Sequence, residues 1–237
     1  MTLGSRLAHQ LRNVLRMQPG DAIIVLDNEG FEYDVVLTKL ARDKAIGRIL
    51  QKRAGSGEPS VRLALCQALL RREKFELVLQ KCTEIGVARF IPLITQRTVV
   101  RGPAAATPRK LARWRRIVTE AAEQSGRARI PSLDSPVHLD QAPQWLDAFD
   151  RCIIASPQQE HTSLAEALGA GRKDPPRTVA LLIGPEGGFS EQELQRAARA
   201  GAVPFGLGPR ILRTETAAVV ASALVLHELG QMHPQPS

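Results

Sequence analysis

Two glycine-rich segments hold the residues whose types and spacing are most suited to chemistry. The first, residues 184–190 (GPEGGFS), follows the apolar run at residues 179–183 and opens a helix with the capping pair Ser190 and Glu193. The second, residues 207–217 (LGPRILRTETA), also follows an apolar run and leads into a helix. Glycine allows positive φ and lets a ligand approach backbone amides, and ligands of open α/β sheets gather at the carboxyl ends of strands. Two such corners can enclose a ligand, so the pattern favours a nucleotide-like cofactor between them.

Each segment also has a purely structural interpretation. The first could be a tight strand-to-helix connection, Glu215 a first-turn carboxylate at a helix dipole, and Arg210 and Arg213 ordinary surface charges. The spacing is not GxGxxG and the sequence has no GxxxxGK[ST], so neither a dinucleotide fold nor a P-loop is supported. The five histidines are scattered without an HExxH, which disfavours metal-dependent hydrolysis and a Ser-His-Asp triad.

The composition is that of a basic protein able to bury a core. The chain has 237 residues, 43% of them hydrophobic, and 32 Lys and Arg against 24 Asp and Glu give a net charge of +8. Clustered Lys and Arg gain free energy by releasing phosphate counterions, but on charge alone nucleic-acid binding and a generally basic surface are equally open. Aromatic residues make up 4% of the chain, which argues against a stacking platform for single-stranded nucleic acid.

The cysteines and the apolar runs favour a cytoplasmic protein. Cys66, Cys82 and Cys152 are widely separated in apolar surroundings, which predicts buried free thiols rather than a disulfide framework or a metal site. The first residues contain no apolar signal segment, and the longest mainly apolar run, residues 217–226, is too short to cross a membrane. We therefore expect a cytoplasmic location and no membrane span.

The first part of the chain has the period-two texture of β-strands. Residues 22–26 and 31–37 flank a glycine-containing turn and predict a hairpin. Further strands are expected at residues 45–51 and 61–66. Together they predict a small β-barrel over residues 1–66, preceded by a short helix that holds the basic residues Arg6, Arg12 and Arg16.

After residue 66 the apolar spacing changes to the 3.6-residue period of helices. One helix is expected to end at Gly86, and another to begin with Thr107 as N-cap and Pro108 at its first position. The second helix is amphipathic, and its basic face is formed by Arg109, Lys110, Arg113 and Arg116.

The remaining apolar runs define the fold class. Runs at residues 152–155, 179–183 and 203–207 are separated by helical patterns, which is typical of a mostly parallel sheet covered on both faces. The expected class for residues 67–237 is therefore α/β.

Both glycine-rich segments strongly resemble motifs of the RsmE family of ribosomal RNA uridine methyltransferases, within the SPOUT superfamily. The matching letters are GPEGGF from Gly184 and LGPRILRTETA from Leu207. Supporting matches are QKCTEIGV from Gln80, Ile91 with Pro92, Trp114 with Ile117, EAAEQSGR from Glu120, and Ile130 with Pro131. The resemblance covers nearly the whole chain.

The resemblance implies a SPOUT-type trefoil-knotted parallel sheet with an N-terminal PUA-like, RNA-binding β-barrel, working as a homodimer. It implies S-adenosylmethionine as cofactor, held by the knot at about residues 180–225, and N3 of a uridine in 16S (small-subunit) ribosomal RNA as methyl acceptor. Relatives usually begin with an extra strand ahead of the segment that here reads RLAHQLR from Arg6. We therefore expect the barrel's first strand to be missing, or the start to be displaced.

The resemblance and the chemistry of the reaction also suggest roles for individual residues. The expected catalytic residues are Arg213, which would stabilise negative charge on the uracil oxygens, and Glu215, which would orient the base or accept its proton. The expected cofactor-binding residues are Ile183, Gly184, Pro185, Glu186, Gly187, Gly188, Leu207, Gly208, Ile211, Leu212 and Thr216. The expected RNA-binding residues are Arg6, Arg12, Arg16, Arg109, Lys110, Arg113, Arg116, Gln124 and Arg127. No metal is expected.

Two alternatives stay open. The same fold could methylate another RNA position, such as a ribose 2′-hydroxyl or a tRNA base, or the protein could be a non-catalytic RNA-binding factor for ribosome assembly. The corner formed by Arg213, Thr214 and Glu215 favours catalysis, because binding alone has no need for it.

Overall fold

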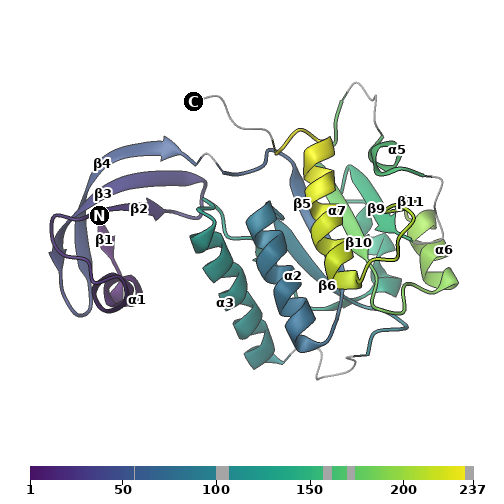
Figure 1. Cartoon of the computed structure of the whole chain (residues 1–237), viewed down its shortest axis with the longest axis horizontal. Helices are drawn as coiled ribbons and strands as arrows, with labels where there is room; N and C mark the ends of the chain where they lie inside the picture. The colour runs from purple at the N-terminus through teal and green to yellow at the C-terminus, as the bar shows by residue number, and fades with distance from the viewer. Residues whose placement is uncertain (56, 100–106, 157–161, 170–173, 233–237) are drawn as a thin grey trace. The chain divides into compact units, whose positions relative to one another are not determined.

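The computed structural model describes residues 1–55, 57–99, 107–156, 162–169 and 174–232 (Figure 1). The chain forms two compact units. One consists of Met1–Glu58 with Gly126–Arg129, and the other of Pro59–Ser125 with Ile130–Ser237.

The N-terminal unit is built on a four-stranded antiparallel sheet with the strand order β1-β4-β3-β2. Its elements are β1 (Thr2–Leu3), α1 (Ser5–His9), a π-helical turn (Gln10–Val14), β2 (Ala22–Leu26), β3 (Phe31–Leu40) and β4 (Ala45–Ala54). The predicted hairpin is confirmed, since β2 pairs with β3 across a turn in which Asn28 and Gly30 have positive φ. The side chains of Leu3, Leu11 and Leu37 form the centre of its small core.

Two expectations for this unit need correction. A first strand is present, because β1 pairs with β4 and the terminal ammonium of Met1 donates to the carbonyl of Gly47 at 2.9 Å. The strand expected at residues 61–66 does not belong to this sheet. It is β5 (Arg62–Ala68), a strand of the larger sheet, and all its residues after Arg62 are buried, as is typical of a parallel strand covered on both faces.

The second unit is a parallel sheet with the strand order β11-β9-β10-β5-β6-β7, and β8 also pairs with β6. This confirms the predicted α/β class; the knot stays a prediction. The other strands are β6 (Arg89–Ile94), β7 (Ser132–Leu133), β8 (Val137–His138), β9 (Arg151–Ala155), β10 (Thr178–Ile183) and β11 (Ala202–Phe205). The helices are α2 (Arg72–Ile85), α3 (Pro108–Gln124), a short 3₁₀ helix (Leu139–Gln141), α4 (Pro143–Leu146), α5 (Leu164–Leu168), α6 (Glu191–Arg199) and α7 (Thr214–Glu228).

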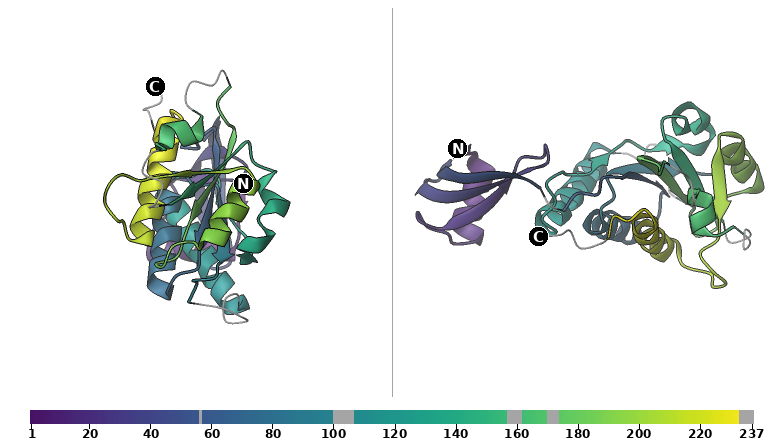
Figure 2. Two further views of the ribbon diagram at one scale, coloured as in Figure 1. Left: turned by 90° about the vertical axis from the view of Figure 1, so that its right-hand side faces the viewer. Right: turned by 90° about the horizontal axis from the view of Figure 1, so that it is seen from above.

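Alternate residues of the central strand β10 face two different cores. Val179, Leu181 and Ile183 pack in the cluster that includes residues of α2, α3, α5 and α7, whereas Ala180 and Leu182 pack in the cluster that includes α4 and α6. The left view of Figure 2 shows the yellow α7 and the green α6 on opposite faces of the sheet. The predicted continuous apolar runs therefore arise because both faces of these strands are covered.

The three cysteines lie in these cores, as expected, and are free thiols. Burial raises the pKa of Cys82 to about 12 and that of Cys152 to about 11, and it raises that of Cys66 as well. Since the thiolate is the reactive form, we expect almost no labelling by an alkylating reagent at pH 8 in the folded protein and labelling of all three thiols in denaturant. Mass spectrometry of the adducts checks this. A thiol that reacts as fast in the folded as in the unfolded protein would contradict the burial.

Candidate active site

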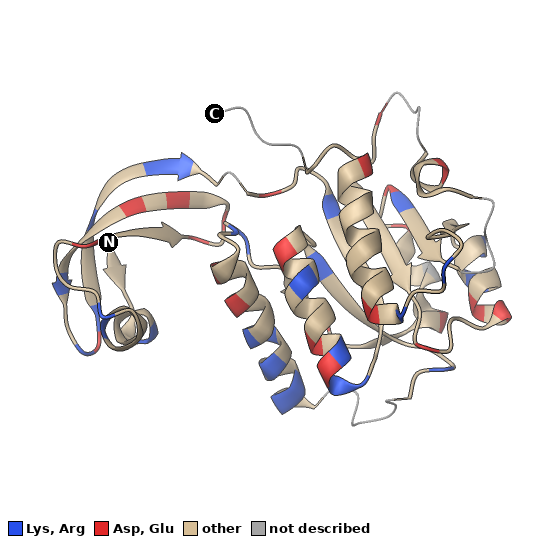
Figure 3. Cartoon of the chain, in the orientation of Figure 1, with Lys and Arg blue, Asp and Glu red and all other residues tan. Residues whose placement is uncertain are grey.

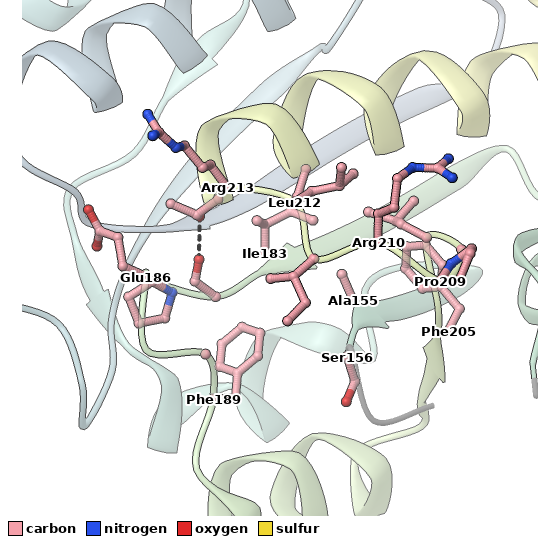
Figure 4. A pocket seen from close by; sticks show the side chains of 18 of the residues that line it. Ala155, Ser156, Ile183, Glu186, Phe189, Phe205, Pro209, Arg210, Leu212 and Arg213 are labelled. Atoms are coloured by element: carbon pink, nitrogen blue, oxygen red, sulfur yellow. Dashed lines mark hydrogen bonds between the residues drawn. The ribbon is translucent and has the colours of Figure 1, made fainter. Parts of the chain in front are cut away.

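A cavity with a volume of about 450 Å³ lies at the carboxyl ends of the neighbouring strands β11, β9 and β10 (Figure 4). Its walls come from the segments that follow these strands, from the start of α7 and from one side chain of α2. The described residues that line it are Lys74, Ala155, Ser156, Ile183, Gly184, Pro185, Glu186, Gly188, Phe189, Phe205, Leu207, Gly208, Pro209, Arg210, Ile211, Leu212, Arg213, Thr214 and Ala217. The two glycine-rich segments thus meet at one cavity.

The first segment turns sharply after β10 and enters α6. The amide of Gly188, a residue with φ of +68°, donates to the carbonyl of Pro185 at 2.8 Å. A Cβ on Gly184 would lie 3.2 Å from ring atoms of Phe189, so glycine permits the aromatic ring to pack against the backbone there. The predicted capping box is confirmed, since Ser190 and Glu193 cap α6 reciprocally.

The second segment is fixed to the first by Thr214, at the first turn of α7. The Thr214 hydroxyl donates to the carbonyl of Gly184 at 2.5 Å and accepts from Nε2 of the buried Gln67 at 3.2 Å. One side chain therefore joins α7, the loop after β10 and the end of β5.

Replacing Thr214 with valine keeps the shape of the side chain but removes this hydroxyl. We expect a loss of about 1–3 kcal/mol in the free energy of unfolding, because the Gly184 carbonyl loses a buried donor. Thr214→Ser, which keeps the hydroxyl, should lose clearly less. Urea denaturation measures both values, and equal losses would mean that packing of the methyl group matters rather than the hydrogen bonds.

Charged groups gather beside the cavity. The ammonium of Lys74 lies 3.3 Å from Oε1 of Glu186 and 3.4 Å from Oε2 of Glu215, so it joins the two segments by ion pairs. The Glu215 side chain is 12% exposed, and its Oε2 makes no hydrogen bond within the part of the chain that the structure describes. In Figure 4 the guanidinium groups of Arg213 and Arg210 extend away from the centre of the cavity, toward opposite sides.

Most of the predicted catalytic and cofactor-binding residues meet at this cavity. Arg213 and nine of the expected cofactor-binding residues line the cavity, whereas Gly187, Thr216 and Glu215 are not among its described lining residues. Glu215 is connected to it through Lys74. The roles assigned to these residues stay predictions.

Several lining residues were not predicted from the sequence. Phe189, Pro209, Arg210, Thr214 and Ala217 lie inside the two glycine-rich segments, so the motifs could have indicated them. The others lie on elements that the sequence predicted, but nothing in the local sequence marked them as site residues: Lys74 on α2, Ala155 and Ser156 at the end of β9, and Phe205 on β11.

The basic residues of α3 differ in how strongly they are bound within the protein. Figure 3 shows the Lys and Arg residues of α3 gathered in the first part of the helix. Nε of Arg116 lies 3.5 Å from Oε1 of Glu120, an ion pair that contributes little because both side chains are exposed. Arg109 and Arg116 are exposed, but the Arg113 guanidinium donates two hydrogen bonds to the Glu76 carboxylate, at 2.6 and 2.8 Å. The Lys110 ammonium lies 4.9 Å from the centre of the Trp114 ring. Arg109 and Arg116 are therefore better placed for phosphate contacts than Arg113.

The hydrogen bonds from Arg113 hold the pKa of Glu76 below its ordinary value of 4.5, with a smaller contribution from Arg72. A carboxyl whose folded pKa is lowered stabilises the fold above its unfolded pKa, and this stabilisation is lost as the pH falls through the folded value. We therefore expect Arg113→Gln to unfold more easily than the wild type at pH 7 and the difference to shrink at pH 3. Unfolding curves at both pH values check this, and a difference that is the same in acid would contradict it.

The other predicted RNA-binding residues divide in the same way. Arg6, Arg12, Arg16 and Gln124 are exposed. Arg127 is 4% exposed, and its guanidinium donates to the carboxylate of Glu58 at 2.8 Å. The amide of Arg129 donates to the same carboxylate at 3.0 Å. These contacts favour a structural role for Arg127 within the N-terminal unit over the expected contact with RNA.

No group of three or more His, Cys, Asp or Glu side chains among the described residues could hold a metal ion. No helix in the described ranges is both long and apolar enough to span a membrane.

Comparisons with known proteins find two matching family models. Residues 57–226 match a model described as an RNA methyltransferase domain, and residues 7–50 match one described as an RNA methyltransferase PUA domain. Ribosomal RNA small subunit methyltransferase E of Bacillus subtilis is 34% identical over 93% of this chain and 87% of its own length. The protein of the same name from Synechocystis is 35% identical over 95% of this chain and 72% of its own length.

A solved structure agrees with these sequence matches. It is that of a ribosomal RNA small subunit methyltransferase E from Neisseria gonorrhoeae bound to S-adenosyl methionine. It is 32% identical to this chain, with a TM-score of 0.83, and the match covers 96% of this chain and 91% of that one.

Proposed function

Because this chain belongs to the RNA methyltransferase family, we propose that it transfers the methyl group of S-adenosylmethionine to N3 of a uridine in small-subunit ribosomal RNA. The observation that carries the proposal is the single cavity to which both glycine-rich segments contribute. The match to the RNA methyltransferase domain model covers both segments. The Neisseria relative, whose match covers most of both chains, binds S-adenosyl methionine.

The cavity suits this cofactor in size and chemistry. Its volume of about 450 Å³ falls within the range of roughly 300–1,000 Å³ that is usual for small-molecule sites. Ile183, Leu207 and Leu212 offer apolar contacts, and the glycine-rich turns offer backbone polar groups. A Cβ on Gly184 would lie 3.2 Å from the Phe189 ring, so glycine lets this ring pack closely against the turn. The lining residues of the two segments would hold the cofactor, which supplies an electrophilic methyl group on a positively charged sulfur.

The protein must present uracil to that methyl group and remove the proton from N3. The N3 lone pair of neutral uracil is delocalised into two flanking carbonyls, so it becomes nucleophilic when the proton leaves and negative charge spreads over the uracil oxygens. Arg213 would stabilise this charge at the mouth of the cavity. Glu215 would orient the base or accept the proton, with its carboxylate held by Lys74. A carbon–sulfur bond breaks, a carbon–nitrogen bond forms, and the proton passes to the protein or to water.

The partners follow from the same proposal. The N-terminal unit and the exposed arginines of α3 would contact the phosphates of ribosomal RNA. We place the active protein in the cytoplasm as a homodimer, as the family resemblance implies. Light scattering behind size-exclusion chromatography tests the dimer.

The function is tested by deleting the gene in its host and mapping the methylation lost from ribosomal RNA. In parallel, the purified chain is incubated with S-adenosylmethionine and small subunits or tRNA from the deletion strain, and the nucleosides are identified by mass spectrometry. Appearance of 3-methyluridine in small-subunit RNA supports the proposal. A 2′-O-methylated nucleoside or methylated tRNA would instead indicate another RNA position. Absence of both methylation and calorimetric heat with the cofactor would indicate a binding factor.

A further inference from the structure

A short turn after β6 lies behind the first glycine-rich segment. In this turn, residues 95–98, the side chains of Thr95 and Thr98 are buried and their hydroxyl oxygens lie 2.8 Å apart. The amide of Thr95 also donates to the Thr98 hydroxyl at 3.0 Å, and the amide of Thr98 donates to the carbonyl of Thr95 at 3.2 Å. These hydrogen bonds close the turn around the two residues between the threonines, Gln96 and Arg97.

Arg97, in the middle of this turn, contacts the backbone of the first glycine-rich segment. Its Nη1 donates to the carbonyl of Gly187 at 2.6 Å and lies 3.4 Å from the carbonyl of Phe189, which is also an acceptor. A Cβ on Gly187 would lie 3.3 Å from Cδ and 3.5 Å from Cβ of Arg97. The aliphatic stem of Arg97 thus packs closely against the position that a side chain at Gly187 would take.

A second contact anchors the end of the same segment. The amide of Gln96 donates to Oε1 of Glu193 at 2.8 Å, and Oε2 of Glu193 accepts from the amide of Ser190 at 2.8 Å. Glu193 is 4% exposed, so this carboxylate joins the turn firmly to the start of α6. The segment is therefore held both at Gly187 and where it enters the helix.

Gly187 was expected to bind the cofactor, but these contacts indicate a different role for it. Its neighbours Glu186 and Gly188 line the cavity, whereas Gly187 contacts Arg97. We propose that Arg97 is a positioning residue, which holds the segment from Pro185 to Phe189 in the conformation that binds S-adenosylmethionine. The inference rests on the proposed function.

The test compares Arg97→Ala with Arg89→Ala. Arg89 is the first residue of β6, the strand that precedes this turn, and its guanidinium pairs with Asp134 at 2.6 Å. Arg89→Ala therefore removes another exposed arginine, one that is paired with Asp134 instead of the first glycine-rich segment. Since Arg97 is exposed, its replacement leaves no core cavity.

We expect Arg97→Ala to raise the Kd and KM for S-adenosylmethionine by about tenfold, because the binding conformation is no longer preorganised. The KM for RNA and the kcat at saturating cofactor should stay within about threefold, and Arg89→Ala should leave all values near those of the wild type.

Two further variants separate positioning from general stability. Arg97→Lys keeps one donor for the Gly187 carbonyl and should recover part of the affinity. Gly187→Ala should weaken cofactor binding when Arg97 is present, because the added methyl group disturbs the contact with Arg97. In the Arg97→Ala background this contact is already absent, so Gly187→Ala should weaken cofactor binding less. Calorimetry with S-adenosylmethionine and thermal unfolding without it are measured for each variant.

The outcomes are distinct. If Arg97→Ala binds the cofactor as the wild type does, or if it lowers kcat and leaves cofactor affinity intact, the positioning role is wrong and the proposed function stands. Additive effects of Arg97→Ala and Gly187→Ala would also reject it. A wild-type chain that does not bind S-adenosylmethionine would overturn the proposed function and this inference together.

Discussion

Replacing Arg213 with alanine is expected to lower kcat by about 10²–10³-fold, the usual effect of removing one group that stabilises charge in a transition state. The Kd for S-adenosylmethionine should change by less than about threefold, because the proposed role is toward the uracil oxygens rather than the cofactor. The structure is compatible with such a split, since Arg213 is one of the residues that line the cavity but its guanidinium extends away from the cavity's centre. Single-turnover rates and calorimetry measure the two quantities.

Arg210 provides a matched comparison for Arg213. It lies on the same segment and lines the same cavity, but its guanidinium extends to the other side. If the position of the guanidinium determines its effect on turnover, Arg210→Ala should lower kcat clearly less than Arg213→Ala does. Arg213→Lys should recover part of the lost kcat, since lysine keeps the positive charge but not the planar guanidinium. Equal losses of turnover and cofactor affinity in Arg213→Ala would reject the assignment and indicate a wall residue. Equal losses of turnover in Arg213→Ala and Arg210→Ala would indicate that the net charge beside the cavity, and not the position of one guanidinium, determines kcat.

The meeting of the two glycine-rich segments could be predicted because it depends on local patterns. Each segment follows an apolar run, and the carboxyl ends of parallel strands lie at one edge of a sheet. Lys74, Ala155 and Ser156 could not be found in this way. They reach the cavity because β9 lies between β10 and β11 and because α2 packs beside α7, and neither neighbour relation is written in the local sequence.

The errors in the N-terminal part have a similar cause. The apolar run that forms β5 follows the strands of the first unit closely in sequence, but it pairs with β10 and β6 of the other sheet. Periodicity indicates that a segment is a strand, whereas the choice of sheet depends on tertiary packing.

The carboxylate partners of two arginines could not be predicted either, because they are distant in sequence. Glu76 lies 37 residues from Arg113, and Glu58 lies 69 residues from Arg127. A basic face seen in the sequence therefore overstates the number of guanidinium groups free for RNA.

The difference between the exposed arginines of α3 and Arg113, which is bound to Glu76, leads to a prediction for RNA binding. Replacing Arg109, Arg115 and Arg116 of α3, all exposed, with glutamine should weaken binding to small-subunit RNA by about tenfold or more at low salt. Each phosphate contact to a single strand contributes about 0.7 to the slope of log K against log salt, so loss of three should flatten the slope by about 2. Filter binding between about 50 and 200 mM salt measures it.

Arg113→Gln is the control for this triple variant, because it removes the same charge from the same helix at a position where the guanidinium already binds Glu76. If phosphate contact decides, the control should lose fold stability at neutral pH yet leave the salt slope almost unchanged. If instead every positive charge on α3 contributes through the long-range field, Arg113→Gln should lower affinity as much as any one of the exposed arginines does. An unchanged slope in the triple variant would place the RNA contacts elsewhere, and the next set to replace would then be Arg6, Arg12 and Arg16 of the N-terminal unit.

The exposed α3 arginines lie on the unit that contains the cavity. Weaker RNA binding should therefore appear as a higher KM for RNA, while the KM for S-adenosylmethionine stays constant.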